Sequence, residues 1–399
     1  MHIGVCLGHF EPDVGGGFAF VTSVADAFLR SAPASGHRYT MFAASSYADR
    51  LSSELKAENI GVCGMRRANV LDRALMAARH HSPLCRFLMS GGGPLERLAR
   101  KRGVQFMWFV GGGAYDALDI PYMATVWDLQ HRTHPWFPEV SHGGRWDYRE
   151  VTQSRFLQRA SHVITGTEIG RDQLGWYYQV PAERISVLPH PAPTAADIER
   201  VSEPISAKVA GLKNDTFLLY PAQFWSHKNH VNLLLGLKVL REKFGHTPRL
   251  ALTGSDKGNA DYVRRQVDQL GLANQVAMLG FVSGSDLAYL YQHAKALVYV
   301  SWSGPENLPP LEAFSYGCPV INADFPGARE QLGSGALYVD PSDPEAIARG
   351  IQAILENGSL REQLVENGRE RAMRWTTADY VERVFAILNS FEPVRRAWE

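Results

Sequence analysis

The chain has 399 residues, of which 45% are hydrophobic and 21% charged, and its formal net charge at pH 7 is zero. This composition is typical of a soluble globular protein, and the length exceeds one ordinary core, so we expect two domains. No stretch of about 18 apolar residues occurs, which argues against a membrane-spanning helix. The chain has no strong basic excess, so we expect no nucleic acid partner.

The first residues, MHIGVCLGHFEPDVGG, lack the charged start and long apolar core of a secretory signal. We therefore expect the protein in the cytoplasm. The four cysteines form no Cys-x-x-Cys pair and have no histidine at metal-ligand spacing, so we expect buried thiols rather than disulfides or a zinc site. They are Cys6, Cys63, Cys85 and Cys318.

The chain opens with a pattern typical of a Rossmann-like domain. An apolar run at 2–7 precedes three glycines at 15–17, and apolar residues then recur at helical spacing over 18–29. Without Cβ atoms, Gly16 and Gly17 would let the backbone approach a bound ligand closely, so both are candidate ligand contacts.

Two series of strand-like runs with helical patterns between them follow. This alternation predicts an α/β fold with two mostly parallel sheets, joined by the proline-rich linker at 188–196. After the last strand, helices are expected at 344–355, 360–374 and 376–391. The further strands are expected at 38–42, 104–110, 123–126 and 162–165, then at 217–220, 249–253, 276–279, 296–300 and 319–321.

Positive charge is concentrated in one stretch, 66–102, which has nine Lys or Arg against two acids. Apolar residues are interleaved with these charges. Such a basic amphipathic surface can lie on an anionic membrane leaflet, while a solvated helix face with no partner explains the same pattern.

The segment Gly304–Glu312, GPENLPPLE, is the most informative in the chain. It follows a predicted buried strand and opens a predicted helix. The first N–H groups of a helix can bind phosphate, and Glu312 could accept hydrogen bonds from sugar hydroxyls. The segment therefore indicates a sugar-nucleotide site.

Four stretches resemble the retaining glycosyltransferases of family 4, and they occur in the order found in that family. The resemblance implies the GT-B fold, in which two Rossmann-like domains face each other across a cleft and a C-terminal helix crosses back to the first domain. It implies an acceptor domain at 1–190 with helix 376–399, and a donor domain at 197–375. The stretches are GPENLPPLEAFSYGCPVI from Gly304, LLYPAQFWSHKNH from Leu218, MATVWDLQH from Met123 and VITGT from Val163.

The resemblance also implies the donor-site residues. Lys228 matches the lysine that binds the diphosphate, and Gln223 stands where the family generally has an arginine. Glu312 matches the second motif glutamate, which binds ribose, whereas Gly304 stands in place of the first. Either Glu306 substitutes for that carboxylate, or the backbone N–H groups of Glu306, Asn307 and Leu308 hold the sugar and phosphate.

In the first domain, the family usually has His-Asp after the Ala-Thr-Val strand, whereas this chain has Trp127 and Asp128. His131 is the nearest replacement for the missing histidine, and Asp128 could orient an acceptor hydroxyl. Arg171 could face the cleft and pair with phosphate. The alternatives are a capping role for Asp128, a loop role for His131 and an exposed helical position for Arg171.

No Asp-x-Asp pair occurs to hold a divalent cation on a diphosphate, so we expect a metal-independent reaction without a cofactor. The resemblance implies transfer of a hexose from GDP-mannose or a UDP-hexose to a glycan or lipid-linked acceptor in polysaccharide or lipopolysaccharide biosynthesis. The enzyme would be cytoplasmic or peripheral on the inner face of the cytoplasmic membrane. One alternative is a nucleotide-sugar-binding or assembly protein that lost catalysis. An epimerase or phosphorylase of the same architecture is another.

Overall fold

A computed structural model gives the fold as two compact units, which are described separately. Unit 1 consists of 1–135, 140–188 and 378–399, and unit 2 of 136–139 and 189–377. The structure describes residues 1–9, 15–55, 57–66, 69, 72, 74, 78, 82, 84, 92–113, 115–193 and 205–398.

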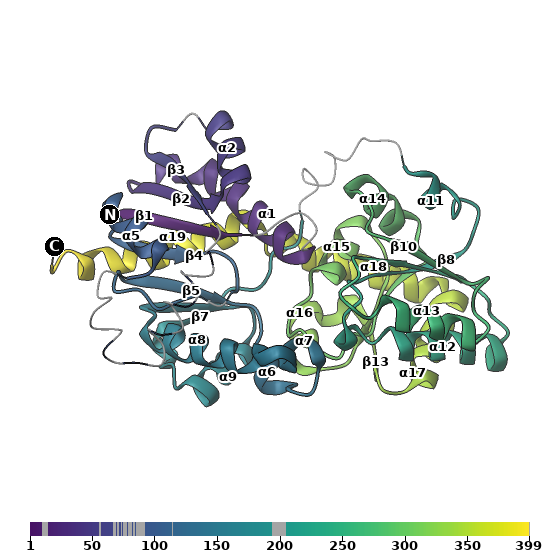
Figure 1. Ribbon diagram of the computed structural model, residues 1–399. Helices are drawn as coiled ribbons and strands as arrows, with labels where there is room; N and C mark the ends of the chain where they lie inside the picture. The colour runs from purple at the N-terminus through teal and green to yellow at the C-terminus, as the bar shows by residue number, and fades with distance from the viewer. Residues whose placement is uncertain are drawn as a thin grey trace. The chain divides into compact units, whose positions relative to one another are not determined.

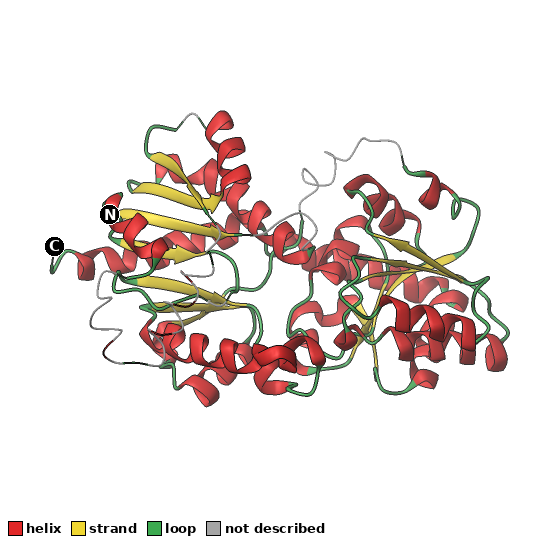
Figure 2. Ribbon diagram, viewed as in Figure 1, coloured by secondary structure: helices red, strands yellow, loops and turns green. Residues whose placement is uncertain are grey.

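Unit 1 contains a parallel sheet of seven strands in the order β3-β2-β1-β4-β5-β6-β7, with helices packed around it (Figures 1 and 2). The order reverses beside β1, because β2 lies on one side of it and β4 on the other. The strands are β1 (His2–Gly8), β2 (Arg38–Ala44), β3 (Ile60–Met65), β4 (Phe106–Phe109), β5 (Tyr122–Val126), β6 (His162–Thr165) and β7 (Ile185–Val187). The described α-helices are α1 (Gly16–Ser31), α2 (Ser45–Glu54), α5 (Pro94–Lys101), α6 (Gln130–Thr133), α7 (Pro138–Ser141), α8 (Arg145–Arg159) and α9 (Glu168–Tyr178).

Unit 2 repeats this architecture with a parallel sheet of six strands in the order β10-β9-β8-β11-β12-β13. The order reverses between β8 and β11. The strands are β8 (Phe217–Pro221), β9 (Arg249–Thr253), β10 (Val276–Gly280), β11 (Ala296–Tyr299), β12 (Val320–Ala323) and β13 (Ala336–Val339). The helices are α11 (Ala207–Ala210), η5 (Ser226–Lys228), α12 (His230–Phe244), α13 (Ala260–Gln269), α14 (Gly284–His293), α15 (Leu308–Tyr316), α16 (Pro326–Leu332), α17 (Pro344–Glu356) and α18 (Gly358–Met373).

The apolar runs form strands because a parallel sheet covered on both faces buries every side chain of its central strands. All seven residues of β1 are buried, as are all residues of β4, β5, β11 and β12. The prediction of two Rossmann-like domains is confirmed. The sequence analysis did not predict β3, β7 and β13, which are short or interrupted by glycine.

The last helix, α19 (Thr377–Arg395), packs on unit 1 although it follows unit 2 in the sequence (Figure 1). Phe391 lies 4.8 Å from Phe106 of β4 between ring centroids, and Phe385 lies 5.9 Å from Phe28 of α1. Arg395 Nε donates to the Gln105 carbonyl at 3.2 Å. The predicted return of the C-terminal helix to the first domain is confirmed.

Most of the basic stretch 66–102 lies outside the described residues, including Arg67, Arg73, Arg79 and Arg86. Within the described part, Arg100 pairs with Glu96 at 2.7 Å, and Arg97 Nη1 donates to the Gly92 carbonyl at 2.7 Å. A membrane surface at 66–102 thus stays a prediction. Among the described helices, none has the length and apolarity needed to cross a bilayer.

Candidate functional site

The reversal of strand order between β8 and β11 marks the expected ligand position in unit 2. In a parallel sheet, loops leave the carboxyl ends of the strands at one edge, and ligands bind where neighbouring loops diverge. The loop after β8 carries Lys228, and the loop after β11 carries the segment Gly304–Asn307. The sequence motifs of the second half therefore converge at this edge.

The backbone around Lys228 is fixed by buried hydrogen bonds. Asn229 has a left-handed φ of 58°, and its Nδ2 donates to the carbonyls of Val300 and Pro341 at 2.9 and 2.8 Å. Asparagine tolerates this conformation better than most residues. The Tyr220 hydroxyl donates to the Lys228 carbonyl. The turn that presents Lys228 is thus tied to both β8 and the end of β11.

The Lys228 ammonium is held by two neutral oxygen acceptors. Its Nζ donates to the Tyr299 hydroxyl at 2.9 Å and to Asn307 Oδ1 at 3.2 Å. The Tyr299 hydroxyl in turn donates to Asn307 Oδ1 at 3.1 Å. No carboxylate pairs with Lys228 within the part of the chain that the structure describes, so its charge is not neutralised by an ion pair.

Gly304 has a structural role that accounts for the departure from the family motif. Its φ is +114°, a conformation that L side chains rarely adopt, and a Cβ there would lie 2.7 Å from Asn307 Oδ1. The Asn307 side chain folds back and donates from Nδ2 to the Gly304 carbonyl at 2.9 Å. The Asn307 carboxamide therefore occupies the space that a side chain at 304 would need.

Glu306 is bonded to His190, at the start of the main segment of unit 2, rather than to Lys228. Its side chain is 2% exposed, Oε1 accepts from the His190 N–H at 2.7 Å, and Oε2 lies 3.1 Å from His190 Nδ1. Burial raises the pKa of Glu306 to about 8 and lowers the pKa of His190 to about 4. Burial thus disfavours both a negative charge on Glu306 and a positive charge on His190.

The start of α15 offers fewer free donors than the sequence suggested. The Asn307 N–H already donates to Gln331 Oε1 at 3.1 Å. Leu308 begins the helix, and Pro309 and Pro310 follow it without N–H groups. Backbone N–H groups at Asn307, Pro309 and Pro310 are therefore not available to bind an anion. More of the anion binding then depends on Lys228.

Glu312 lies in α15, five residues after Asn307. This separation is about 7.5 Å along the helix axis. Glu312 is partly exposed, and Oε2 accepts from the Tyr291 hydroxyl at 2.6 Å. Burial raises the pKa of Glu312, and the hydrogen bond from Tyr291 opposes that shift. Because Tyr291 orients one oxygen, the other oxygen can accept a ligand hydroxyl.

The remaining polar residues after β8 shape the loop. Gln223 Oε1 accepts from Trp225 Nε1 at 3.0 Å, and His230 stacks on Phe224 with ring centroids 4.7 Å apart. Burial lowers the pKa of His230 to about 3. His230 is therefore a neutral residue of the core.

Glu139 contacts the Lys228 loop from the short segment Trp136–Glu139, which belongs to unit 2 although most of that unit follows 50 residues later in the sequence. Its Oε1 accepts from the His227 N–H at 3.0 Å and also contacts His227 Nδ1. Burial raises the pKa of Glu139, but the hydrogen bonds from His227 outweigh this effect and the pKa is lowered. This carboxylate anchors the residue next to Lys228.

In unit 1, Gly16 and Gly17 begin α1, the helix that follows the strand β1 in the chain, and the strand order reverses beside β1. Gly15 has a φ of 74°, which glycine accommodates without strain. Arg171 is 42% exposed on α9 and pairs with Glu168 at 2.5 Å. The structure thus places both glycines at the expected edge and Arg171 on an exposed helical surface.

Asp128 follows β5 and is held as a carboxylate. Arg149 Nη2 donates to its Oδ1 at 2.8 Å, and the Gln130 N–H donates to the same oxygen at 2.8 Å. Burial raises the pKa of Asp128, but Arg149 and the hydrogen bonds outweigh this effect and the pKa falls to about 2. The carboxylate ties the loop 127–130 to α8.

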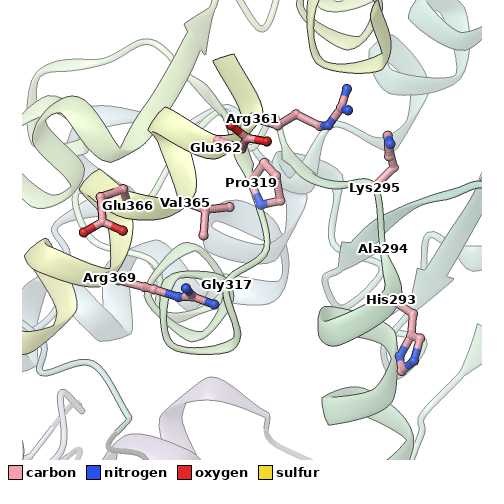
Figure 3. A pocket seen from close by; sticks show the side chains of 10 residues that line it. All are labelled: His293, Ala294, Lys295, Gly317, Pro319, Arg361, Glu362, Val365, Glu366 and Arg369. Carbon is pink, nitrogen blue, oxygen red and sulfur yellow. The ribbon is translucent and has the colours of Figure 1, made fainter. Parts of the chain in front are cut away.

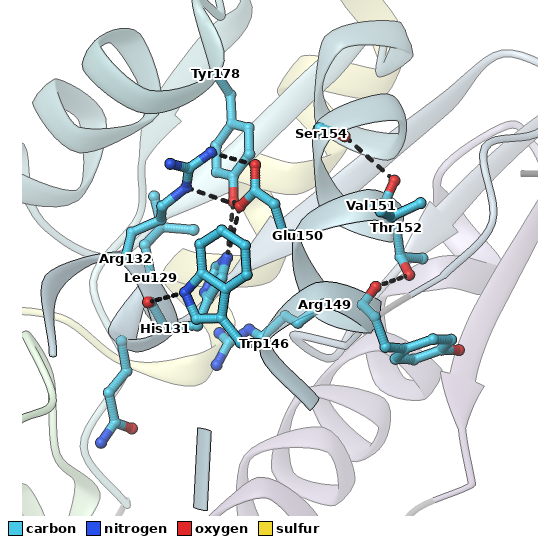
Figure 4. A network of polar contacts seen from close by, with 12 residues as sticks. Leu129, His131, Arg132, Trp146, Arg149, Glu150, Val151, Thr152, Ser154 and Tyr178 are labelled. Atoms are coloured by element: carbon cyan, nitrogen blue, oxygen red, sulfur yellow. Dashed lines mark hydrogen bonds and ion pairs between the residues drawn. The ribbon is translucent and has the colours of Figure 1, made fainter. Parts of the chain in front are cut away.

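His131 is completely buried in a polar network between α6, α8 and α9 (Figure 4). Its Nε2 lies 2.8 Å from the Tyr178 hydroxyl and 3.3 Å from Glu150 Oε2. Arg132 Nε donates to the same Glu150 oxygen at 2.7 Å, and Trp146 Nε1 donates to the His131 carbonyl at 2.7 Å. Burial lowers the pKa of His131 to about 4. His131 thus stabilises its loop and has no exposed surface for a substrate.

Trp127 packs where the family has histidine. Its indole lies edge-on to Phe20, with ring centroids 5.5 Å apart, and a Cβ at Gly112 would lie 2.8 Å from it. The glycine therefore makes room for the indole. A large apolar ring takes the position after β5 that would otherwise carry a polar group.

A separate pocket of about 450 Å³ lies between α18 and the loops that precede β11 and β12 (Figure 3). It is at the amino ends of these strands, away from Lys228. Arg361 donates to the carbonyls at the end of α17, and the Arg369 guanidinium lies against Gly317 at the end of α15. Cations stabilise helix C-termini, so these charges need no bound anion to explain them.

Tyr299, Gln331, Glu139 and His190 are the site residues that sequence reasoning missed. Tyr299 lies inside the predicted strand 296–300, and a tyrosine there is indistinguishable from a core residue by pattern alone. The other three meet the site from 24 to 116 residues away in sequence. No local spacing could have indicated them.

The fold is that of GT-B proteins. The structure superposes on Anabaena HepE, which was solved in complex with UDP and glucose, with a TM-score of 0.69 and 15% identity, covering 98% of this chain and 100% of that one. This likeness concerns the fold alone.

Residues 202–371 match the family model described as "Glycosyl transferases group 1". The chain is 31% identical over 198 residues to the O-antigen chain mannosyltransferase RfbU of Salmonella typhimurium strain LT2, covering 50% of this chain and 52% of that protein. It is 28% identical to the O-antigen chain mannosyltransferase B of Escherichia coli, covering 60% and 63%. The second half of the chain thus resembles the group 1 glycosyl transferases, and the chain spans between half and two thirds of these relatives' length in the alignments.

Proposed function

We propose that this protein is a retaining glycosyltransferase that moves a hexose from a nucleotide diphosphate sugar to a hydroxyl of a glycan or lipid-linked acceptor. One observation carries the proposal. Lys228, a cation with no carboxylate partner among the described residues, lies at the strand-order reversal of unit 2 and is bonded to Asn307, the residue that precedes the Glu312 helix. A diphosphate on Lys228 and a ribose on Glu312 fit this arrangement.

For this transfer, the site must stabilise the negative charge that grows on the departing phosphate. The bond between the anomeric carbon and the phosphate oxygen breaks, and a bond to the acceptor oxygen forms on the same face. The acceptor proton passes to the departing phosphate oxygen, so no protein base is required. Lys228 would donate a hydrogen bond to the phosphate throughout, which makes the absence of a histidine at Trp127 tolerable.

The donor is proposed by analogy. Two relatives are named as mannosyltransferases, which favours GDP-mannose, and the structural neighbour HepE holds UDP and glucose, which makes a UDP-hexose the second choice. A thermal-shift panel of GDP, UDP and dTDP sugars separates these, because a ligand that binds only the folded chain raises its melting temperature.

The test is transfer by the wild type and two variants. Lys228→Ala and Glu312→Ala should each lower kcat/KM at least about tenfold, which is about 1.4 kcal/mol in the barrier. Lys213→Ala, an exposed lysine of unit 2, should not change it. Wild-type activity in both site variants would refute the proposal. Tight nucleotide binding without transfer to any acceptor would instead favour the non-catalytic binding protein.

A further inference from the structure

We infer that Tyr299, Asn307 and Gln331 position the Lys228 ammonium for a diphosphate, and that this arrangement replaces the first carboxylate of the family motif. With Gly304, these residues are called the Lys228 cluster. The inference rests on the proposed function. It assigns Tyr299 and Gln331 roles that act through Lys228 rather than by contact with the substrate.

The hydrogen bonds of the Lys228 cluster give each polar atom a defined role as donor or acceptor. A tyrosine hydroxyl has one hydrogen, and it is directed to Asn307 Oδ1 at 3.1 Å, so its oxygen accepts from Lys228 at 2.9 Å. Asn307 Nδ2 donates to the Gly304 carbonyl at 2.9 Å, which fixes the amide orientation. A flipped amide would place its NH₂ against the ammonium. In this arrangement Lys228 donates to both oxygens, and the Tyr299 hydroxyl accepts from Lys228 and donates to Asn307.

Gln331 fixes the backbone of Asn307. Its side chain accepts from the Asn307 N–H at 3.1 Å and donates to the Asn307 carbonyl at 3.0 Å, and Gln331 is only 5% exposed. The helix that carries Gln331, α16, packs closely on Pro305, two residues before Asn307, because a Cβ at Gly327 would lie 2.5 Å from the Pro305 carbonyl oxygen. The amide that holds Lys228 is thus supported from two elements.

The cluster orients the ammonium without consuming its charge. An ammonium has three N–H donors, and two of them are directed to a hydroxyl and an amide oxygen. The remaining donor and the full positive charge are then available to a phosphate oxygen. A carboxylate in the place of the Asn307 amide would pair with Lys228 and weaken its attraction for a diphosphate.

A double-mutant cycle tests the inference. The affinities of GDP, UDP and the corresponding nucleosides are measured by calorimetry for wild type, Tyr299→Phe, Lys228→Ala and the double variant. Tyr299→Phe should weaken diphosphate binding about fivefold to tenfold and leave nucleoside binding unchanged. In the Lys228→Ala background, the same change should have no further effect on diphosphate binding.

The control is Tyr262→Phe, an exposed tyrosine on α13, which should change neither affinity. Gln331→Glu adds an independent variant, since it keeps the size of the side chain and removes the donor to the Asn307 carbonyl. It should weaken diphosphate binding alone. Equal losses for nucleoside and diphosphate, or an undiminished Tyr299→Phe effect without Lys228, would overturn the positioning role. Diphosphate binding with the expected cycle but without sugar transfer would overturn the proposed function and leave the positioning role intact.

Discussion

Restoring the family's carboxylate at position 304 should damage the site. Gly304→Glu gives this chain the first glutamate of the family motif, so similarity alone suggests a gain in activity. The structure predicts the opposite, because φ at this residue is +114° and a Cβ would lie 2.7 Å from Asn307 Oδ1. The amide must move, and Lys228 then loses one of its two acceptors.

Gly304→Glu should lower both the free energy of unfolding and the affinity for a diphosphate. Backbone strain at a φ that only glycine adopts readily costs about 1–3 kcal/mol of folding free energy. A hydrogen bond to a charged group contributes about 1.5–3 kcal/mol. Because Gly304→Glu loses the bond from Lys228 to Asn307, its diphosphate affinity should fall about tenfold to a hundredfold. The strain should also lower the melting temperature by about 3 °C or more.

The assay separates these two effects. Gly258 also has a positive φ, +99°, but a Cβ there meets nothing within 4 Å. We expect Gly258→Ala to lose stability without losing diphosphate affinity, and both Gly304→Ala and Gly304→Glu to lose stability and affinity. Calorimetric titration with GDP or UDP and a melting curve measure both. A Gly304→Glu variant that binds or transfers as well as the wild type would show that the reasoning about Asn307 is wrong.

Three further outcomes follow from burial and hydrogen bonding. Burial raises the pKa of Glu306 to about 8 from the ordinary 4.5, so the folded chain retains a proton that the unfolded chain loses, and this contribution to stability declines as the pH rises toward 8. Denaturant unfolding should therefore show the wild type losing about 1.5 kcal/mol more than Glu306→Gln between about pH 6.5 and 8, and equal slopes would contradict the assignment. Asn229→Ala removes two buried bonds and leaves alanine at a φ of 58°, so unfolding free energy should fall by about 2–4 kcal/mol, whereas an unchanged value would argue against the turn. Tyr291→Phe should raise the donor KM several-fold with little change in kcat, because Tyr291 orients the Glu312 carboxylate. An unaltered KM would show that Glu312 does not bind the donor.

Much of the fold followed from local pattern. Continuous apolar runs such as 296–300 form buried strands because a covered parallel sheet leaves no polar face, and glycine and proline mark the loops. The three-residue β7 could not be predicted, because it takes its conformation from pairing with β6. Local pattern therefore gave the architecture and missed elements stabilised mainly by their neighbours.

The residues of the candidate site were likewise predicted where their motifs are contiguous and missed where they meet only in the fold. Lys228 and Glu312 were found because their motifs are contiguous, but their roles remain proposals. The sequence could not explain why glycine replaces the family's glutamate at position 304, because the explanation depends on how the Asn307 side chain folds back. The bond from Lys228 to Tyr299 joins residues 71 positions apart, and only the sheet order brings them together.

The indole of Trp375 donates to the Pro189 carbonyl at 2.8 Å across 186 positions of sequence, and both residues lie near positions where the chain passes between units 1 and 2. The next residue, His190, donates its backbone N–H to Glu306, the immediate neighbour of Asn307. Two hydrogen bonds, from Trp375 to Pro189 and from His190 to Glu306, thus connect the start of unit 2 to the immediate neighbour of the residue that holds Lys228.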